Sequence, residues 1–166
     1  MISIAVAEKR GNELFTLIHG CAARCGLEAV LLRPDTGEKC DVLVMAPSYA
    51  RKSAILKKLP VACDTVVLPG LCALETAGAR QIVSYGLSPR DTLTLSSMNG
   101  GNMVAALLRE IVNIGGKRLD RQEIVLPPGN GLNPAGLLAA LGALLCAGAD
   151  PVALPQDLFA LAGPDA

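Results

Sequence analysis

The sequence predicts an α/β domain in which helices cover both faces of a mostly parallel sheet, with a β-hairpin and a helix near the carboxyl end. Two observations predict this class. Short, β-branched and almost wholly apolar runs alternate with helix-like segments over the first half of the chain, which is typical of parallel strands buried on both faces. Hydrophobic residues make up 51% and charged residues 18% of the 166 residues, enough for one core of ordinary size. We therefore expect residues 1–166 to form a single three-layer, Rossmann-like or P-loop-like domain.

The first half of the chain supplies the parallel strands. Five runs have the expected length and composition: residues 2–6, 28–32, 41–45, 65–69 and 81–85. Between the first two runs, apolar residues recur at helical spacing, which predicts a helix over about residues 13–25 that Gly26 can end in the left-handed conformation. A second helix is expected over about residues 48–59.

The second half begins with a change of pattern. Residues 92–97 alternate like a strand, whereas residues 103–127 leave two alternatives open. The spacing of Met103 and Leu107 suits a helix, but Gly115 and Gly116 between two β-rich flanks suit a hairpin. We favour the hairpin.

A long apolar segment near the carboxyl end predicts a buried helix. Asn133 can cap this helix, and Pro134 can be its first residue, because a missing N–H costs nothing at that position. We expect the helix to run to about residue 147 and to end at Gly148. A short helix near residues 155–161 should close the domain.

Composition excludes two classes of partner. Fifteen basic residues balance fifteen acidic ones, so no electrostatic attraction to nucleic acid or to an anionic membrane is expected. The aromatic set of two tyrosines and two phenylalanines is also too small to stack single-stranded bases. The longest uncharged run, residues 135–149, falls short of the ~20 residues that cross a bilayer.

The cysteines predict a reducing environment and no metal site. Six occur without a C-x-x-C pair, and no signal peptide precedes them, so we expect a cytoplasmic protein. Cys21 and Cys25 lie four residues apart on the first helix, where packing as small apolar residues is a better explanation than a pair of ligands. Cys72, just after a strand, is the strongest candidate for a reactive thiol, and His19 is expected at the surface of the first helix.

The loop between the first strand and the first helix has the layout of a phosphate site but lacks its chemistry. A P-loop, G-x-x-x-x-G-K-[ST], binds phosphates with backbone N–H groups, a lysine and a hydroxyl that holds magnesium. Aligned on this pattern the chain has Val6, Gly11, Asn12 and Glu13, so only the second glycine matches. A carboxylate in the first helical turn stabilises a helix and repels an anion. We therefore expect that Glu13 prevents ATP from binding.

Three segments, in this order, resemble the central nucleotide-binding domain of the Mur ligase family, which joins amino acids to peptidoglycan precursors with ATP. The opening "ISIAVAEKRGNELFTLIHGCAARCG" is similar to the family's strand, P-loop and first helix. The segment "QIVSYGLSPRDTLTLSS" resembles its "V-x-[ST]-Y-G" strand, and "LPPGNGLNPAGLLAALGALLCAGADPVAL" resembles its "PG-x-HN-x-x-N-x-LAA" loop and helix. The resemblance implies a bacterial protein with a shortened version of this domain.

The positions at which the chain differs from the family are those that carry the family's chemistry. The lysine and hydroxyl of the P-loop are replaced, and residues 46–48, Ala-Pro-Ser, stand near the place of a magnesium-binding glutamate. Asn133 matches the first asparagine of the HN-x-x-N segment if one loop residue is inserted, but Leu132 replaces the histidine and Gly136 the second asparagine. The family's acidic "NADDP" stretch and its flanking domains have no counterpart. ATP-driven ligation is therefore not expected.

These observations favour a non-catalytic binding, scaffold or regulatory module without a cofactor, a metal or catalytic residues. The alternative is an enzyme or binding protein for a nucleotide or sugar-phosphate, which would bind the anion with backbone N–H groups of the first strand-helix loop. The partner would be a small molecule or a protein, and the alanine-rich helix leaves a homo-oligomer open. The candidate ligand-binding residues are Lys9, Arg10, Gly11, Asn12, Ser48 and Asn133.

Overall fold

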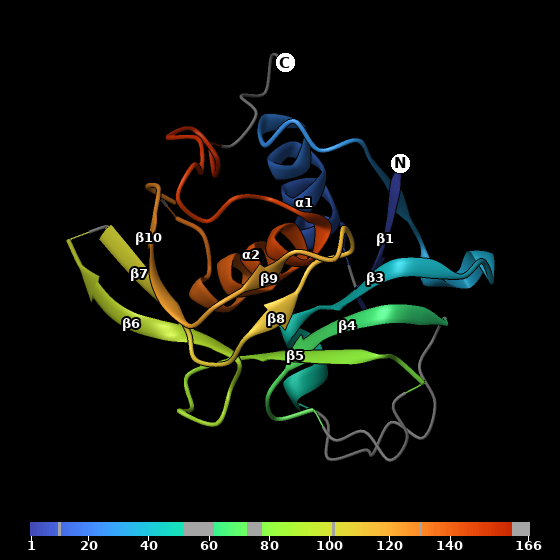
Figure 1. The fold of residues 1–166 in the computed structure, drawn as a ribbon, viewed down its shortest axis with the longest axis horizontal. Helices are drawn as coiled ribbons and strands as arrows, with labels where there is room; N and C mark the ends of the chain where they lie inside the picture. The colour runs from blue at the N-terminus through green and yellow to red at the C-terminus, as the bar shows by residue number, and fades with distance from the viewer. Residues whose placement is uncertain (10, 52–61, 73–77, 101, 130, 161–166) are drawn as a thin grey trace.

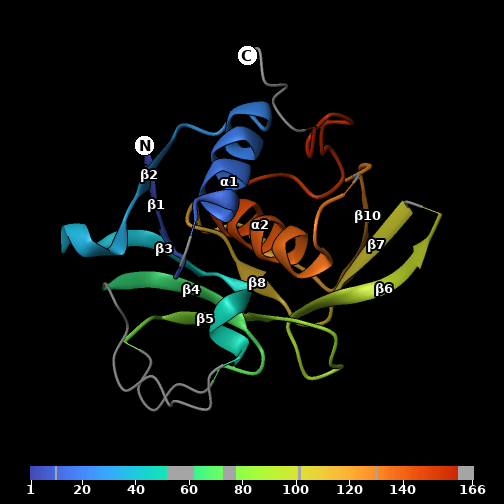
Figure 2. The same cartoon turned by 180° about the vertical axis from the view of Figure 1, so that it is seen from behind.

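The computed structural model describes residues 1–9, 11–51, 62–72, 78–100, 102–129 and 131–160. Over these residues, eight strands form one sheet that curls around the helix α2 (Pro134–Ala147) (Figure 1). The helix α1 (Glu13–Arg24) packs beside α2 on the same side of the sheet (Figure 2).

The sheet is mostly parallel. Its strands, in spatial order, are β10 (Gln122–Leu126), β7 (Asn102–Leu107), β6 (Leu93–Asn99), β5 (Gln81–Tyr85), β4 (Cys63–Pro69), β3 (Cys40–Met45), β1 (Ile2–Ala7) and β2 (Ala29–Leu32). Neighbours are parallel from β6 to β2, and β7 runs against both β6 and β10. The predicted α/β class with a mostly parallel sheet is confirmed. Residues 42–45 of β3 have no exposed surface, which explains why this strand is apolar without alternation.

Local signals fix both ends of α2 as predicted. The Asn133 side chain accepts a hydrogen bond from the Ala135 N–H at 2.9 Å, and Pro134 begins the helix. Gly148 follows the last turn with a φ of 113°, in the left-handed region. Every residue from 137 to 147 is buried within one chain. The apolar surface of α2 is thus used inside the monomer, which removes the reason for expecting an oligomer through this helix.

The segment 103–127 contains strands and a hairpin rather than a helix, as favoured from the sequence. The hairpin pairs β8 (Ile111–Val112) with β9 (Arg118–Leu119), and Gly116 turns it with a φ of 85°. The side-chain amide of Gln81 joins the hairpin to β5, because it donates to the Val112 carbonyl at 3.0 Å and accepts from the Val112 N–H at 2.8 Å.

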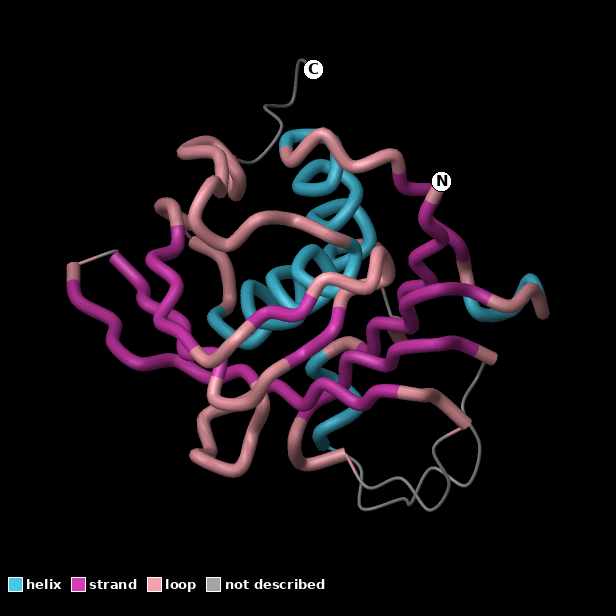
Figure 3. Tube along the Cα trace, in the orientation of Figure 1, coloured by secondary structure: helices cyan, strands magenta, loops and turns pink. Residues whose placement is uncertain are grey.

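Two expected helices differ in the structure. The helix predicted over residues 48–59 is represented by a 3-10 helix, Pro47–Arg51, and residues 52–59 lie outside the described part of the chain. A second 3-10 helix, Pro34–Thr36, follows β2. Residues 155–160 form turns instead of the expected short helix (Figure 3). Two hydrogen bonds close these turns, from the Leu158 N–H to the Pro155 carbonyl and from the Ala160 N–H to the Asp157 carbonyl. Leu158 and the adjacent Phe159 are both buried, so tertiary packing sets the conformation here.

Candidate functional site

The loops after β1 and β3 meet at the carboxyl edge of the parallel strands. The chain continues from β1 to β2 on one side, whereas β3 lies on the other side of β1. In open α/β sheets, ligands bind outside the strand ends at such a change of direction. Lys9 follows β1 and Ser48 follows β3, and the Lys9 ammonium lies 3.4 Å from the Ser48 carbonyl oxygen. The structure therefore brings together two of the six candidate residues.

Glu8 occupies the amino end of α1. Its carboxylate oxygens accept hydrogen bonds from the backbone N–H groups of Leu14, at 3.1 Å, and Phe15, at 2.7 Å. N–H groups of a first helical turn have no partner within the helix, and they are the groups that bind an anion at a helix N-terminus. The chain thus fills this position with its own carboxylate.

Glu13 does not take the place that the sequence analysis gave it. It is an exposed residue at the start of α1, and the carboxylate on the helix end belongs to Glu8, in the preceding loop. A side chain that precedes the helix can fold back over its free N–H groups. The neighbouring Asn12 does not cap α1 either, because its side-chain oxygen accepts a hydrogen bond from the Arg33 guanidinium.

The remaining candidate residues have separate roles. The Lys9 ammonium lies 4.4 Å from the centre of the Tyr49 ring, a distance at which cation and ring attract each other. Gly11 has a φ of 74°, a conformation that favours glycine. Asn133 caps α2, and Arg10 lies outside the described residues.

Sequence reasoning missed Glu8. A weak signal was present, since a carboxylate five residues before the first helical position can reach back to the helix end when the loop is tight. The positions compared with a P-loop did not include it, because that pattern leaves Glu8 among its unspecified residues. The direction of the carboxylate depends on how the chain turns between β1 and α1, which the P-loop pattern does not specify.

A second carboxylate, Asp91, is buried at the ends of β4 and β5. The residue is 5% exposed, and its Oδ2 accepts a hydrogen bond from the Ser88 N–H at 3.1 Å. A Cβ atom added to Gly70 would lie 1.7 Å from Oδ1, and one added to Gly86 would lie 2.5 Å from Oδ2. These two glycines therefore make room for the carboxylate, which indicates a structural role for Asp91.

The cysteine thiols are held in their neutral form. Burial raises the pKa of the Cys72 thiol, and the nearby Lys9 ammonium lowers it in part. Burial also raises the pKa of Cys21 and of Cys146 to about 12. Among the described residues, no three histidine, cysteine or acidic side chains gather as a metal site would require, and His19 is exposed on α1.

Two glycine-rich loops border a hollow of about 370 Å³. One loop, with Gly100, follows Met98 at the end of β6, and the other, with Gly129 and Gly131, precedes α2. No charged side chain lines the hollow among the described residues, and two methionines do. Among the described residues it therefore offers no charged side chain to a phosphate.

Comparison of the chain with protein-family models and with curated proteins finds no match. Over the described residues, no helix has both the length and the apolar character needed to cross a membrane.

Proposed function

We propose that this chain is a non-catalytic binding module, related to the central nucleotide-binding domain of the Mur ligases, that no longer holds ATP. The relationship would make the fold a shortened, Rossmann-like or P-loop-like domain of the bacterial cytoplasm. The six free cysteines suit that reducing compartment.

One observation carries the proposal: the Glu8 carboxylate accepts hydrogen bonds from the Leu14 and Phe15 N–H groups. A hydrogen bond to a charged group contributes about 1.5–3 kcal/mol, so an incoming phosphate would have to replace two such bonds. It would also approach a fixed negative charge at short range. The same helix end that binds phosphate in a P-loop is thus occupied and negative.

The alternative is a protein that binds a nucleotide or a sugar-phosphate at this edge of the sheet. It is favoured by the exposed position of Lys9 beside Ser48, at the change of strand direction. Binding would require Glu8 to leave the helix end and Lys9 to turn from the Tyr49 ring. Each movement breaks a contact within the protein and therefore makes binding less favourable.

Calorimetric titration with ATP and with a UDP-sugar, each with and without magnesium, tests the proposal. We expect no binding heat from the wild-type protein at millimolar ligand. Micromolar, magnesium-dependent binding that Lys9→Ala and Arg10→Ala abolish would contradict the proposal. His19→Ala, at an exposed position on α1, is the matched control and should change nothing in either case.

A further inference from the structure

Two methionines lie opposite each other on the paired strands β6 and β7. Met98, near the end of β6, is the direct cross-strand partner of Met103, near the start of β7. Residues opposite each other in an antiparallel pair share one face of the sheet, with Cβ atoms about 4.5–5.5 Å apart. Both side chains line the hollow of about 370 Å³. Two thioether sulfurs are therefore presented to one space.

One of the two sulfurs is buried and the other is accessible. Met103 is 6% exposed, whereas Met98 is 60% exposed. A methionine side chain has three rotatable bonds, so the Met98 thioether can turn toward the Met103 thioether without a change in the strands. An ion can thus approach from solvent at Met98 and be held by both sulfurs.

The lining of the hollow selects the class of ion. Among the described residues, the lining contains no carboxylate, histidine or cysteine, which are the side chains that bind Zn²⁺, and no carboxylate for Ca²⁺ or Mg²⁺. Thioethers are soft ligands that select Cu(I). The first turn of α2 also borders the hollow, at Pro134. The positive end of the helix dipole disfavours a divalent cation more than a monovalent one.

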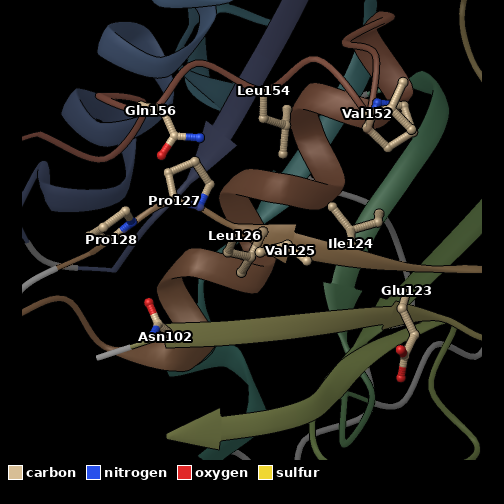
Figure 4. Close-up of a pocket in the computed structure, with 11 residues that line it drawn as sticks. Asn102, Glu123, Ile124, Val125, Leu126, Pro127, Pro128, Val152, Leu154 and Gln156 are labelled. Atoms are coloured by element: carbon tan, nitrogen blue, oxygen red, sulfur yellow. The ribbon is translucent and has the colours of Figure 1, made fainter. Parts of the chain in front are cut away.

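A second space in the molecule has a different chemistry. A groove of about 490 Å³ lies between β10 and residues 151–156 (Figure 4). Its described lining has no methionine, cysteine or histidine. β7 contributes to both spaces, because Asn102 lines the groove and the adjacent Met103 lines the hollow, as alternation along a strand requires. The two thioethers are thus gathered on one side of β7.

We propose that Met98 and Met103 bind one soft monovalent cation of the Cu(I) class through their thioether sulfurs. Two sulfur–metal dative bonds form and the ion loses bound water, without transfer of a proton or an electron. Once one sulfur holds the ion, the second binds within the same molecule, at a high effective concentration. The pair should therefore bind at least tenfold more tightly than a single thioether.

This inference goes beyond the proposed function and does not rest on it. The described lining of the hollow shares no residue with the edge of the sheet at which Glu8 and Lys9 lie. The titration with ATP and the titration with a metal ion therefore have independent outcomes.

Titration with Ag(I), a redox-stable ion of the same class as Cu(I), tests the proposal. Binding is followed by NMR of isotope-labelled methionine methyl groups, which report directly on the sulfur atoms. The Met98 and Met103 signals should shift together and saturate at one ion per chain. The signal of Met45, which has no exposed surface on β3, should not shift. N-acetylmethionine amide provides the affinity of a single thioether.

Thiols also bind Ag(I), so the titration uses the double variant Cys25→Ser, Cys72→Ser as its background. These are the two partly exposed cysteines, and the other four are buried. In this background, Met98→Leu and Met103→Leu each remove one sulfur and keep the apolar volume. In either variant, the remaining methionine of the pair should bind Ag(I) at least tenfold more weakly.

Three outcomes would overturn the inference. The first is a pair that responds only at the ion concentration that N-acetylmethionine amide requires. The second is a Met98 response that Met103→Leu leaves unchanged, since the two sulfurs would then act independently. The third is an equal response to Zn²⁺, since the site would then not select soft ions. Cu(I), added without oxygen as its acetonitrile complex, should reproduce the Ag(I) shifts, and failure to do so would likewise contradict the assigned ion class.

Discussion

Glu8 shows how one side chain changes the chemistry of a helix end. The dipole of α1 favours negative charge at its first turn, whether the charge belongs to a bound phosphate or to the protein. Glu8 and Glu13 both lie near this end, but the Glu8 carboxylate accepts the two backbone hydrogen bonds. Position in the loop, rather than charge alone, therefore decides which residue closes the site.

Replacement of Glu8 should measure this contribution. We expect Glu8→Ala to lower the free energy of unfolding by about 1–2 kcal/mol, as loss of a helix-capping side chain does. Glu13→Ala removes an equal charge near the same helix end but no hydrogen bond to the Leu14 or Phe15 amides, so the free energy of unfolding should fall by less. Urea denaturation of the three proteins at pH 7 provides the comparison. Equal losses for the two variants would show that only the charge matters.

At the scale of the elements, local signals predict well and distant contacts do not. The ends of α2 follow from Asn133, Pro134 and Gly148, three residues next to the helix in the sequence. The position of β10 at the sheet edge could not be predicted, because it depends on pairing with β7 across the intervening hairpin. The turns near residue 158 differ from the predicted helix for a similar reason, since burial against distant residues overrides local propensity there.

The candidate site, too, could be predicted from the sequence only in part. That Lys9 and Ser48 would approach each other follows from parallel strands ending at one edge, which the sequence predicts. The Glu8 hydrogen bonds depend on the path of a loop, for which the sequence carries no comparable signal. A prediction from apolar patterns therefore locates the edge of the sheet but not the side chain that closes the helix end.

The contact between Gln81 and Val112 joins two elements and can be tested alone. We expect Gln81→Ala to speed hydrogen exchange of the Val112 amide by about tenfold, because that N–H loses its acceptor on the Gln81 side chain. The amides of β3, in the centre of the sheet, should exchange as before. Gln122→Ala is the control, since the Gln122 side-chain amide donates to the Asp120 carbonyl, two residues away in the same chain segment. Exchange that accelerates equally in both variants would contradict the joining role.

At the scale of the whole molecule, α2 is the centre around which the sheet is built. The fit is close: a Cβ atom added to Gly142 would lie 2.8 Å from the Val67 Cγ1 atom on β4. Cys146, in the last turn of α2, has no exposed surface, and its thiol must therefore be neutral for the chain to fold. The stability of the fold is thus linked to pH through a buried thiol in the centre of the molecule.

This linkage has a definite sign. Burial raises the pKa of Cys146 from 9.0 to about 12. Between these values the unfolded chain loses the thiol proton and the folded chain keeps it, so the free energy of unfolding falls as pH rises from 9 to 12. For Cys146 the slope is at most about 1.4 kcal/mol per pH unit. Well below pH 9 the thiol is protonated in both states and contributes no slope.

Urea denaturation at intervals from pH 7 to pH 11 tests the linkage on the variant Cys146→Ala. The variant should be less stable than the wild type at pH 7, because the alanine leaves a small cavity beside α2. The difference in free energy of unfolding should then shrink above pH 9, because only the wild type has this thiol, whose proton is lost on unfolding. His19→Ala, at an exposed position on α1, should keep a constant difference from the wild type over the same range above pH 9. A difference for Cys146→Ala that stays constant up to pH 11 would mean that the thiol ionises in the folded protein, and that α2 opens to solvent more readily than its burial implies.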